Sequence, residues 1–141
     1  MMVDDLNRFD SFDELYYPKE EQEQYGVVGI KVSLIVGKSV KGIIDRPAGS
    51  HHPRHPEMIY PINYGFVEGV MAPDGAEQDV YVLGTDKPIK TFEGKVIAVY
   101  YRFDDVEDKW IVSIDGRNYT DEEIIKMIDF QEQYFKGRLL R

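Results

Sequence analysis

The sequence predicts a mainly β protein of the α+β class, with a helix near the C-terminus that packs on a small barrel. Short runs rich in valine and isoleucine recur from residue 26 onward, separated by turns that contain glycine, proline or aspartate. A single amphipathic segment follows the last of these runs. About six short strands followed by one helix favour a Greek-key or OB-like barrel.

Composition limits the classes of protein to consider. The chain has 141 residues, a formal net charge of −9 and no cysteine. This length favours one domain with its own core. Apolar runs stay well short of the ~18 residues that a membrane span needs, and the acidic N-terminus lacks the apolar stretch of a secretory signal. We therefore expect a cytoplasmic protein without a membrane partner and without disulfide or thiolate chemistry.

The charge is concentrated at the N-terminus, which predicts two parts. Residues 1–25 contain eight acidic and two basic residues. We expect them to form an acidic appendage with one amphipathic helix that ends before Pro18. That helix either packs on the remaining domain, residues 26–141, or serves as a dimer arm or lid. The acidic balance disfavours a nucleic-acid partner.

The strands are expected in order along residues 26–114. Predicted strands cover residues 27–36, 40–44, 60–70, 80–83, 95–103 and 109–114. The first two are expected to pair through the turn at Gly37, and the last two are expected to form a hairpin. After them, Thr120 and Glu123 form a capping-box pattern that predicts the start of the helix. Apolar residues recur over four turns up to Phe135, and Gly137 is expected to end the helix.

Carboxylates occur at two places where a chain turn meets a strand. Asp74 lies on an Asp-Gly turn, and Asp79 opens the strand at 80–83. The predicted hairpin loop contains four further acids, which include Asp104 and Asp108. Hard divalent cations prefer such oxygen ligands, whereas the alternative is that both segments are solvated polar turns.

Basic and aromatic residues suggest where an anion would bind. The Arg46 guanidinium, at a strand end, suits two-bonded contact with a phosphate, although an ion pair with a neighbouring acid is the alternative. Tyr60 and Tyr64 are four apart and so share a strand face, either at one rim or in the barrel core. His51, His52 and His55 include enough imidazoles for a zinc site, but their proline-rich surroundings favour an exposed polar loop.

These motifs together resemble the soluble family I inorganic pyrophosphatases. The resemblance covers roughly residues 38 to 136. The segments that carry it read Ile44-Asp45-Arg46-Pro47, Tyr60-Pro61-Ile62-Asn63-Tyr64-Gly65, Asp74-Gly75-x-x-x-Asp79-Val80, Asp104-Asp105-x-Glu107-Asp108 and Phe130-Gln131-Glu132-Gln133-Tyr134. Family membership implies a five-stranded, closed OB-like barrel with magnesium ions and diphosphate in its mouth.

The resemblance also implies site residues. The metal ligands would be Asp74, Asp79, Asp104 and Asp108, with Asp79 shared between two Mg²⁺ ions. The catalytic residues would be Arg46, Tyr64, Asp79 and Tyr134. The substrate-binding residues would be Arg46, Tyr60, Tyr134 and Lys41, of which Lys41 substitutes for a lysine of the family's early strand.

The chain departs from the family pattern at two informative positions. The family reads Asp-Gly-Asp-Pro-x-Asp where this chain has Ala76, so the acid that resembles the family's general base is missing. Phe135 replaces the lysine that follows the helix tyrosine. The resemblance thus implies Mg²⁺-dependent hydrolysis of inorganic diphosphate or a related phosphoanhydride. A catalytically impaired relative that binds phosphate compounds or a protein partner is the alternative. The sequence leaves the oligomeric state open, including a homo-oligomer.

Overall fold

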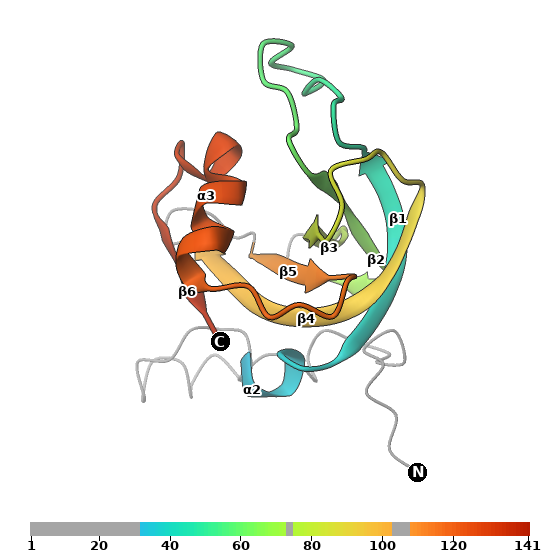
Figure 1. The fold of residues 1–141 in the computed structure, drawn as a ribbon, viewed down its shortest axis with the longest axis vertical. Helices are drawn as coiled ribbons and strands as arrows, with labels where there is room; N and C mark the ends of the chain where they lie inside the picture. The colour runs from blue at the N-terminus through green and yellow to red at the C-terminus, as the bar shows by residue number, and fades with distance from the viewer. Residues whose placement is uncertain (1–31, 73–74, 103–107) are drawn as a thin grey trace.

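A five-stranded barrel with one helix packed on it forms the body of the protein (Figure 1). The computed structural model describes residues 32–72, 75–102 and 108–141. The described elements are α2 (Val32–Ile35), β1 (Ser39–Arg46), β2 (Asn63–Met71), β3 (Glu77–Leu83), β4 (Thr91–Arg102), β5 (Lys109–Ser113), α3 (Asp121–Glu132) and β6 (Gly137–Leu140). The predicted N-terminal appendage, including its helix, lies outside the described residues.

The barrel closes because β4 is long enough to pair with strands on both sides of it. The sheet order is β1-β2-β3-β5-β4-β6, and β1 also pairs with β4. The first part of β4 pairs with β1, its middle with β5 and its last residues with β6. Gly42 lies where β1 contacts both neighbours, since a Cβ there would come within 1.9 Å of the Phe66 carbonyl oxygen. The predicted five-stranded barrel and the β4–β5 antiparallel pair are confirmed.

Two apolar clusters fill the two faces of this curved sheet. One lies inside the barrel and includes Val80 and Trp110, both fully buried. The other lies between the sheet and α3 and includes Tyr81, Ile111 and Ile124. Side chains alternate along a strand. Asp79 and Lys109, two positions before Tyr81 and Ile111, therefore face the same side of the sheet as α3.

Helix α3 begins as the sequence predicts. The Thr120 side chain accepts from the Glu123 amide, and the Glu123 carboxylate accepts from the Thr120 amide, which completes the capping box. The helix ends earlier than predicted, with Gln133 as its C-cap. Gly137 instead starts β6, where a Cβ would lie 2.4 Å from the Tyr101 carbonyl oxygen. It is therefore a glycine of close backbone approach, and the predicted helix stop there is wrong.

The predicted strand at residues 27–36 is wrong over its described part. Residues Val32–Ile35 form α2, a single turn closed by the bond from the Val36 amide to the Val32 carbonyl. Gly37, with a φ of 97°, ends the turn in a conformation that other residues avoid. Within the described residues, β1 pairs with β2 and β4.

No helix in the described part of the chain is both long enough and apolar enough to span a bilayer.

Candidate active site

A cavity of about 800 Å³ opens at one end of the barrel. Residues of the loop between β1 and β2 and residues at the end of α3 contribute to its lining. Figure 1 shows where these two segments lie in the fold. The barrel contributes charged and phenolic side chains to the floor between these segments. The lining includes Arg46, Tyr64, Asp79, Arg102, Lys109 and Tyr134.

At the floor of the cavity, a lysine, a carboxylate and a phenol are bonded together. The Lys109 ammonium donates to the Asp79 carboxylate at 2.7 Å and to the Tyr64 hydroxyl at 2.9 Å. The parallel β3–β5 pairing aligns Val80 with Trp110 and so brings the two preceding residues side by side. Lys109 is buried whereas the Asp79 side chain is 30% exposed, so a fixed positive charge lies beneath an accessible carboxylate.

Arg46 is held against two tyrosine rings at the end of β1. Its guanidinium donates to the Tyr60 hydroxyl at 2.5 Å, and its Cζ lies 5.6 Å from the Tyr60 ring centroid and 5.4 Å from that of Tyr64. Partial burial on its own would lower the Arg46 pKa, but the Tyr60 bond and the surrounding groups raise it above the ordinary value. The side chain is therefore a permanent cation with a fixed position.

A chain of hydrogen bonds runs behind the cavity from Arg46 to the end of α3. The Tyr60 hydroxyl donates to the Gln131 amide oxygen at 2.9 Å, and the Gln131 amide nitrogen donates to the Tyr81 hydroxyl at 2.7 Å. Tyr81 in turn donates to the Glu132 carboxylate at 2.5 Å. All the donors point the same way, so each hydroxyl both accepts and donates. We call this series, Arg46–Tyr60–Gln131–Tyr81–Glu132, the rim chain.

A second guanidinium lies at the far end of the rim chain. Arg102, the last residue of β4, lines the cavity, and its Cζ lies 3.6 Å from the centroid of the Phe135 ring. Its Nε and Nη2 bond the two oxygens of the Glu132 carboxylate. The rim chain thus connects two of the cations that line the cavity.

The structure brings all four predicted catalytic residues to one place. Arg46, Tyr64, Asp79 and Tyr134 all line the cavity, and Tyr134 is 68% exposed at its edge. Tyr60 is completely buried, so its hydroxyl holds Arg46 and is not presented to a ligand.

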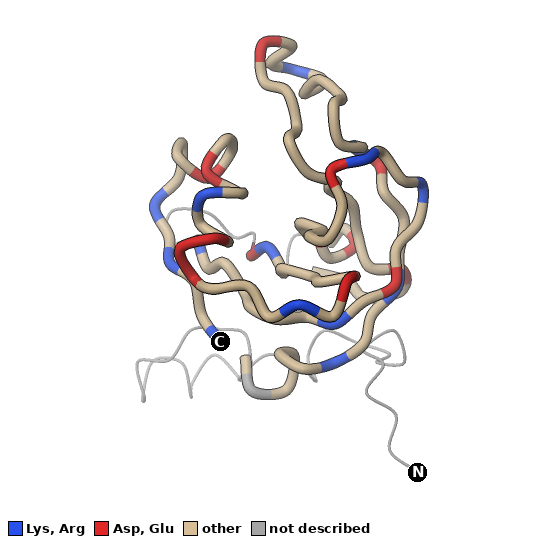
Figure 2. Tube along the Cα trace, in the orientation of Figure 1, with Lys and Arg blue, Asp and Glu red and all other residues tan. Residues whose placement is uncertain are grey.

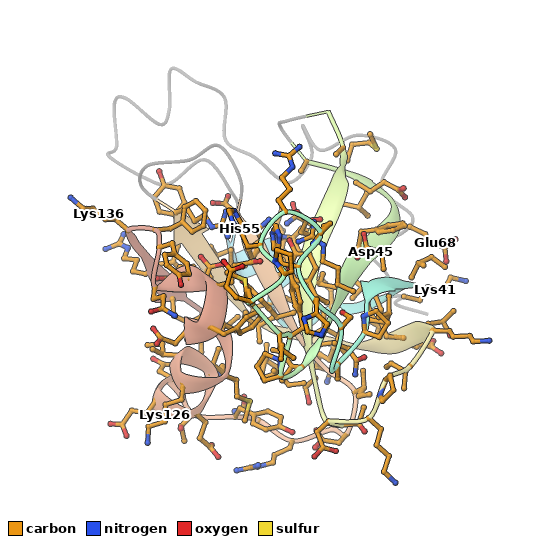
Figure 3. All side chains as sticks on the ribbon, turned by 90° about the horizontal axis from the view of Figure 1, so that it is seen from above. Lys41, Asp45, His55, Glu68, Lys126 and Lys136 are labelled. Atoms are coloured by element: carbon orange, nitrogen blue, oxygen red, sulfur yellow. The ribbon has the colours of Figure 1, made fainter. Side chains whose placement is uncertain are left out.

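Lys41, predicted to bind substrate, is not among the residues that line the cavity. It is an exposed residue of β1 beside Glu68, on the opposite side from α3 and away from His55 (Figure 3). Neither Lys41 nor Tyr60 is therefore placed to contact a ligand in the cavity.

The segment between β2 and β3 contains Ala76, the position at which the sequence resemblance expects an acid. Ala76 is exposed in the tight turn before β3, and its carbonyl accepts from the Ala72 amide. The neighbouring Glu77 carboxylate accepts from the Gly69 amide at 2.9 Å and does not line the cavity. Glu77 in this position does not contribute a carboxylate to the cavity.

The predicted Mg²⁺ ligands are only partly within the described residues. Asp74 and Asp104 lie outside them. Asp79 lines the cavity, while Asp108 is largely buried and its carbonyl accepts from Gln78. In the described ranges no three His, Cys, Asp or Glu side chains gather as a metal-binding group. An accessible carboxylate facing space for phosphate still fits Mg²⁺, which is commonly bound by one or two carboxylates together with substrate oxygens and water.

Comparison with known proteins shows to which family the chain belongs. The family described as inorganic pyrophosphatase matches residues 37–137. The chain belongs to the inorganic pyrophosphatase family. A curated inorganic pyrophosphatase from Saccharolobus solfataricus is 33% identical over 78 residues, which are 53% of this chain and 45% of that protein. The chain therefore aligns with less than half the length of this pyrophosphatase.

Solved pyrophosphatase structures share the fold. The inorganic pyrophosphatase from Ehrlichia chaffeensis superposes with a TM-score of 0.54 at 18% identity, covering 72% of this chain and 85% of that one. The inorganic pyrophosphatase from Thermus thermophilus gives a TM-score of 0.53 at 20% identity, covering 68% and 72%. At these identities the superpositions show the common barrel.

Several residues of the site were missed by sequence reasoning. Lys109, Arg102 and the helix residues Gln131 and Glu132 were not predicted to belong to it, and Arg54 on the β1–β2 loop was not predicted to line the cavity. Lys109 had one available signal, because it directly follows an acidic run and precedes the apolar residues 110–112. The others became visible only once α3 and the β1–β2 loop were placed around the barrel mouth.

Proposed function

We propose that the chain hydrolyses inorganic diphosphate, or a related phosphoanhydride, to phosphate in a Mg²⁺-dependent reaction. The observation that carries this proposal is the meeting of Arg46, Lys109 and Asp79 in one cavity of a pyrophosphatase-family barrel. Two fixed cations and an accessible carboxylate suit a ligand that is strongly anionic and associated with a metal ion.

The chain's own residues would act mainly by charge and position. Arg46, held by Tyr60, would donate to phosphate oxygens and stabilise charge on the leaving phosphate. Lys109 would add positive charge from below and hold the Tyr64 hydroxyl toward the reacting group. Tyr134 would contact phosphate from the opposite edge of the cavity. Bound diphosphate would displace water from these four side chains, Arg46, Lys109, Tyr64 and Tyr134.

Asp74, Asp79, Asp104 and Asp108 are the proposed Mg²⁺ ligands. Bound Mg²⁺ supplies neutralisation of the diphosphate charge and a lowered pKa for a coordinated water. Because general-base catalysis contributes typically ~10²–10⁴-fold, an enzyme with Ala76 in place of the acid would be slow but measurable.

The direct test is phosphate release from diphosphate with Mg²⁺ at high enzyme concentration. We expect release above a no-enzyme blank and a substantial loss of it in Arg46→Met. Absence of release from diphosphate, and from nucleoside diphosphates and triphosphates, would remove the enzymatic proposal.

A non-catalytic relative is the second candidate. It is favoured by the exposed Ala76 and by Phe135, whose ring is covered by the Arg102 guanidinium. Such a protein would bind phosphate compounds through the same cavity without hydrolysing them, or would bind a protein partner. Calorimetric binding of diphosphate with no turnover supports the first form, whereas absence of both Mg²⁺ and diphosphate binding leaves only the second.

A further inference from the structure

The loop at residues 47–59, between β1 and β2, is a folded wall of the cavity. Its two sides are joined by bonds from the Gly49 amide to the Tyr60 carbonyl at 2.7 Å and from the Tyr60 amide to the Ser50 carbonyl at 2.9 Å. Farther out, the His52 amide donates to the Met58 carbonyl at 2.8 Å. The loop therefore projects from the barrel in a defined shape (Figure 1).

The geometry of the loop fixes the state of the His52 ring. Its Nδ1 accepts from the backbone amides of Arg54 at 3.0 Å and His55 at 3.2 Å. A nitrogen that accepts carries no proton, so the neutral ring has its proton on Nε2. Burial and the nearby Arg46 charge lower the His52 pKa, which keeps the ring neutral. Within the described residues, Nε2–H has no hydrogen-bond acceptor.

His52 lies one layer outward from the cations at the cavity floor. Its ring is parallel to that of Tyr60, with centroids 6.2 Å apart, and Tyr60 holds Arg46. Both His52 and Arg54 line the same cavity as Arg46 and Lys109. The donors in the cavity thus form an inner group, Arg46 and Lys109, and an outer group on the loop.

One acid accompanies the outer group. The loop tip carries one basic and one acidic position, Arg54 and Glu57 (Figure 2). The Glu57 carboxylate also lines the cavity and lies 3.9 Å from the His55 imidazole. His52 and Arg54 are therefore the donors of the outer group. His55 is not included, because its imidazole lies beside the Glu57 carboxylate.

The size of the cavity suits a ligand larger than a small anion. A volume of about 800 Å³ lies in the range of pockets that enclose drug-sized ligands, roughly 300–1,000 Å³. Diphosphate, bound by the inner group, would leave the outer donors facing water. A linear chain one phosphate longer would reach them.

We propose that the β1–β2 loop binds the third phosphate of a linear triphosphate, with His52 Nε2–H and the Arg54 guanidinium as donors. This inference rests on the phosphoanhydride hydrolysis proposed above. Water would attack the terminal phosphorus in the inner group, forming a new phosphorus–oxygen bond as the bond to the bridging oxygen breaks. The bridging oxygen leaves with the bonding electrons on a diphosphate, or on a nucleoside diphosphate, and the proton from water passes to solvent.

The test uses a substitution that separates the two nitrogens of His52. In His52→Asn, the amide oxygen takes the place of Nδ1 as acceptor for the loop amides, while the Nε2–H donor is lost. We expect KM for inorganic triphosphate to rise about tenfold, since a bond to a charged group is worth that much, and KM for diphosphate to change less than twofold. Arg54→Gln should behave in the same way. His51→Asn is the matched control and should leave both KM values unchanged, because His51 is exposed and does not line the cavity, and the asparagine amide can replace its Nδ1 as donor to the Pro56 carbonyl.

Two further arms decide the remaining outcomes. A nucleoside triphosphate should show the same change as inorganic triphosphate if the phosphate alone is recognised, and a larger effect of His52→Asn on inorganic triphosphate identifies the free chain as the better ligand. Equal changes for diphosphate and triphosphate, or no change for either, would overturn the proposal.

If no substrate is hydrolysed, the proposed function fails by itself, and calorimetric binding of inorganic triphosphate with Mg²⁺ then tests the loop. A tenfold loss of affinity in His52→Asn supports the loop site, and an unchanged affinity rejects it.

Discussion

The Arg102 guanidinium and the Glu132 carboxylate form a buried, two-bonded ion pair that joins the end of β4 to the last turn of α3. The bonds measure 2.9 and 2.7 Å, and each side chain is only 3% exposed. Since a buried charge without its partner is costly, Glu132→Leu should lower the free energy of unfolding by about 3–5 kcal/mol in urea titrations. The double variant Arg102→Met, Glu132→Leu should recover part of this loss. A double variant less stable than Glu132→Leu would show that the pair is not the cause.

Gln131 is expected to position Arg46 through the rim chain. In Gln131→Leu, Tyr60 loses its acceptor and Tyr81 loses a donor, which should cost about 1–3 kcal/mol for each buried group left unpaired. With Tyr60 released, Arg46 is held less firmly. KM for diphosphate should therefore rise several-fold, and kcat should fall by a smaller factor. Gln133→Leu is the matched control, because Gln133 is exposed and bonds only within the helix end. Equal kinetic effects of the two substitutions would exclude this role.

The stability of the fold should decrease in alkaline solution partly because of Tyr81. Burial, together with the Glu132 charge, raises the Tyr81 pKa well above its ordinary value of 10.0. Above pH 10 the unfolded chain therefore loses this proton while the folded chain keeps it, and stability falls with rising pH by up to about 1.4 kcal/mol per pH unit. Urea midpoints measured between pH 9 and pH 11, as an order-of-magnitude window, should show a shallower decline for Tyr81→Phe. Identical slopes would contradict the assignment.

Asp79→Asn should weaken Mg²⁺ binding by tenfold or more, on the order of one lost carboxylate ligand, and more than Glu77→Gln does. Asp79 faces the cavity, whereas the Glu77 carboxylate is bonded to the Gly69 amide. Calorimetric titration with Mg²⁺ measures both variants. Equal effects would mean that Glu77 has become a ligand.

Restoring the acid, in Ala76→Asp, should raise diphosphatase activity. The position is exposed in a turn, so an added carboxylate has room there. A recovered general base is worth ~10²–10⁴-fold when correctly placed, and an increase of about tenfold would show partial recovery. Phosphate release is the measurement. A flat response would mean that the site has changed in more than this one residue.

The sequence predicted the barrel well because its strands carry their own signals. Alternation and β-branched runs located β1 to β5, and the Thr120–Glu123 pair located the start of α3. The four residues of α2 could not be assigned, because a short apolar run has no period that separates one helical turn from a strand. β6 was missed for a similar reason, since its four residues pair only where Gly137 allows close approach to β4.

The site was predicted less completely, for reasons of tertiary structure. Arg46, Tyr64, Asp79 and Tyr134 belong to motifs that can be recognised locally. Lys109 could not be predicted as buried, because its partner on β3 is set by the parallel pairing of strands 30 residues apart. Gln131 and Glu132 occupy the polar side of an amphipathic helix in the sequence and are buried because their side chains bond to tyrosines of the barrel mouth and, for Glu132, to Arg102.

The position of β5 between β3 and β4 has a consequence for synthesis on the ribosome. β5 is the last of the five barrel strands to be translated, so until residue 113 has left the exit tunnel both of its neighbours present an open edge. Unpaired edges recruit strands from other chains. The nascent polypeptide is thus most vulnerable to aggregation during that interval, and a chaperone that shields strand edges would be most useful then.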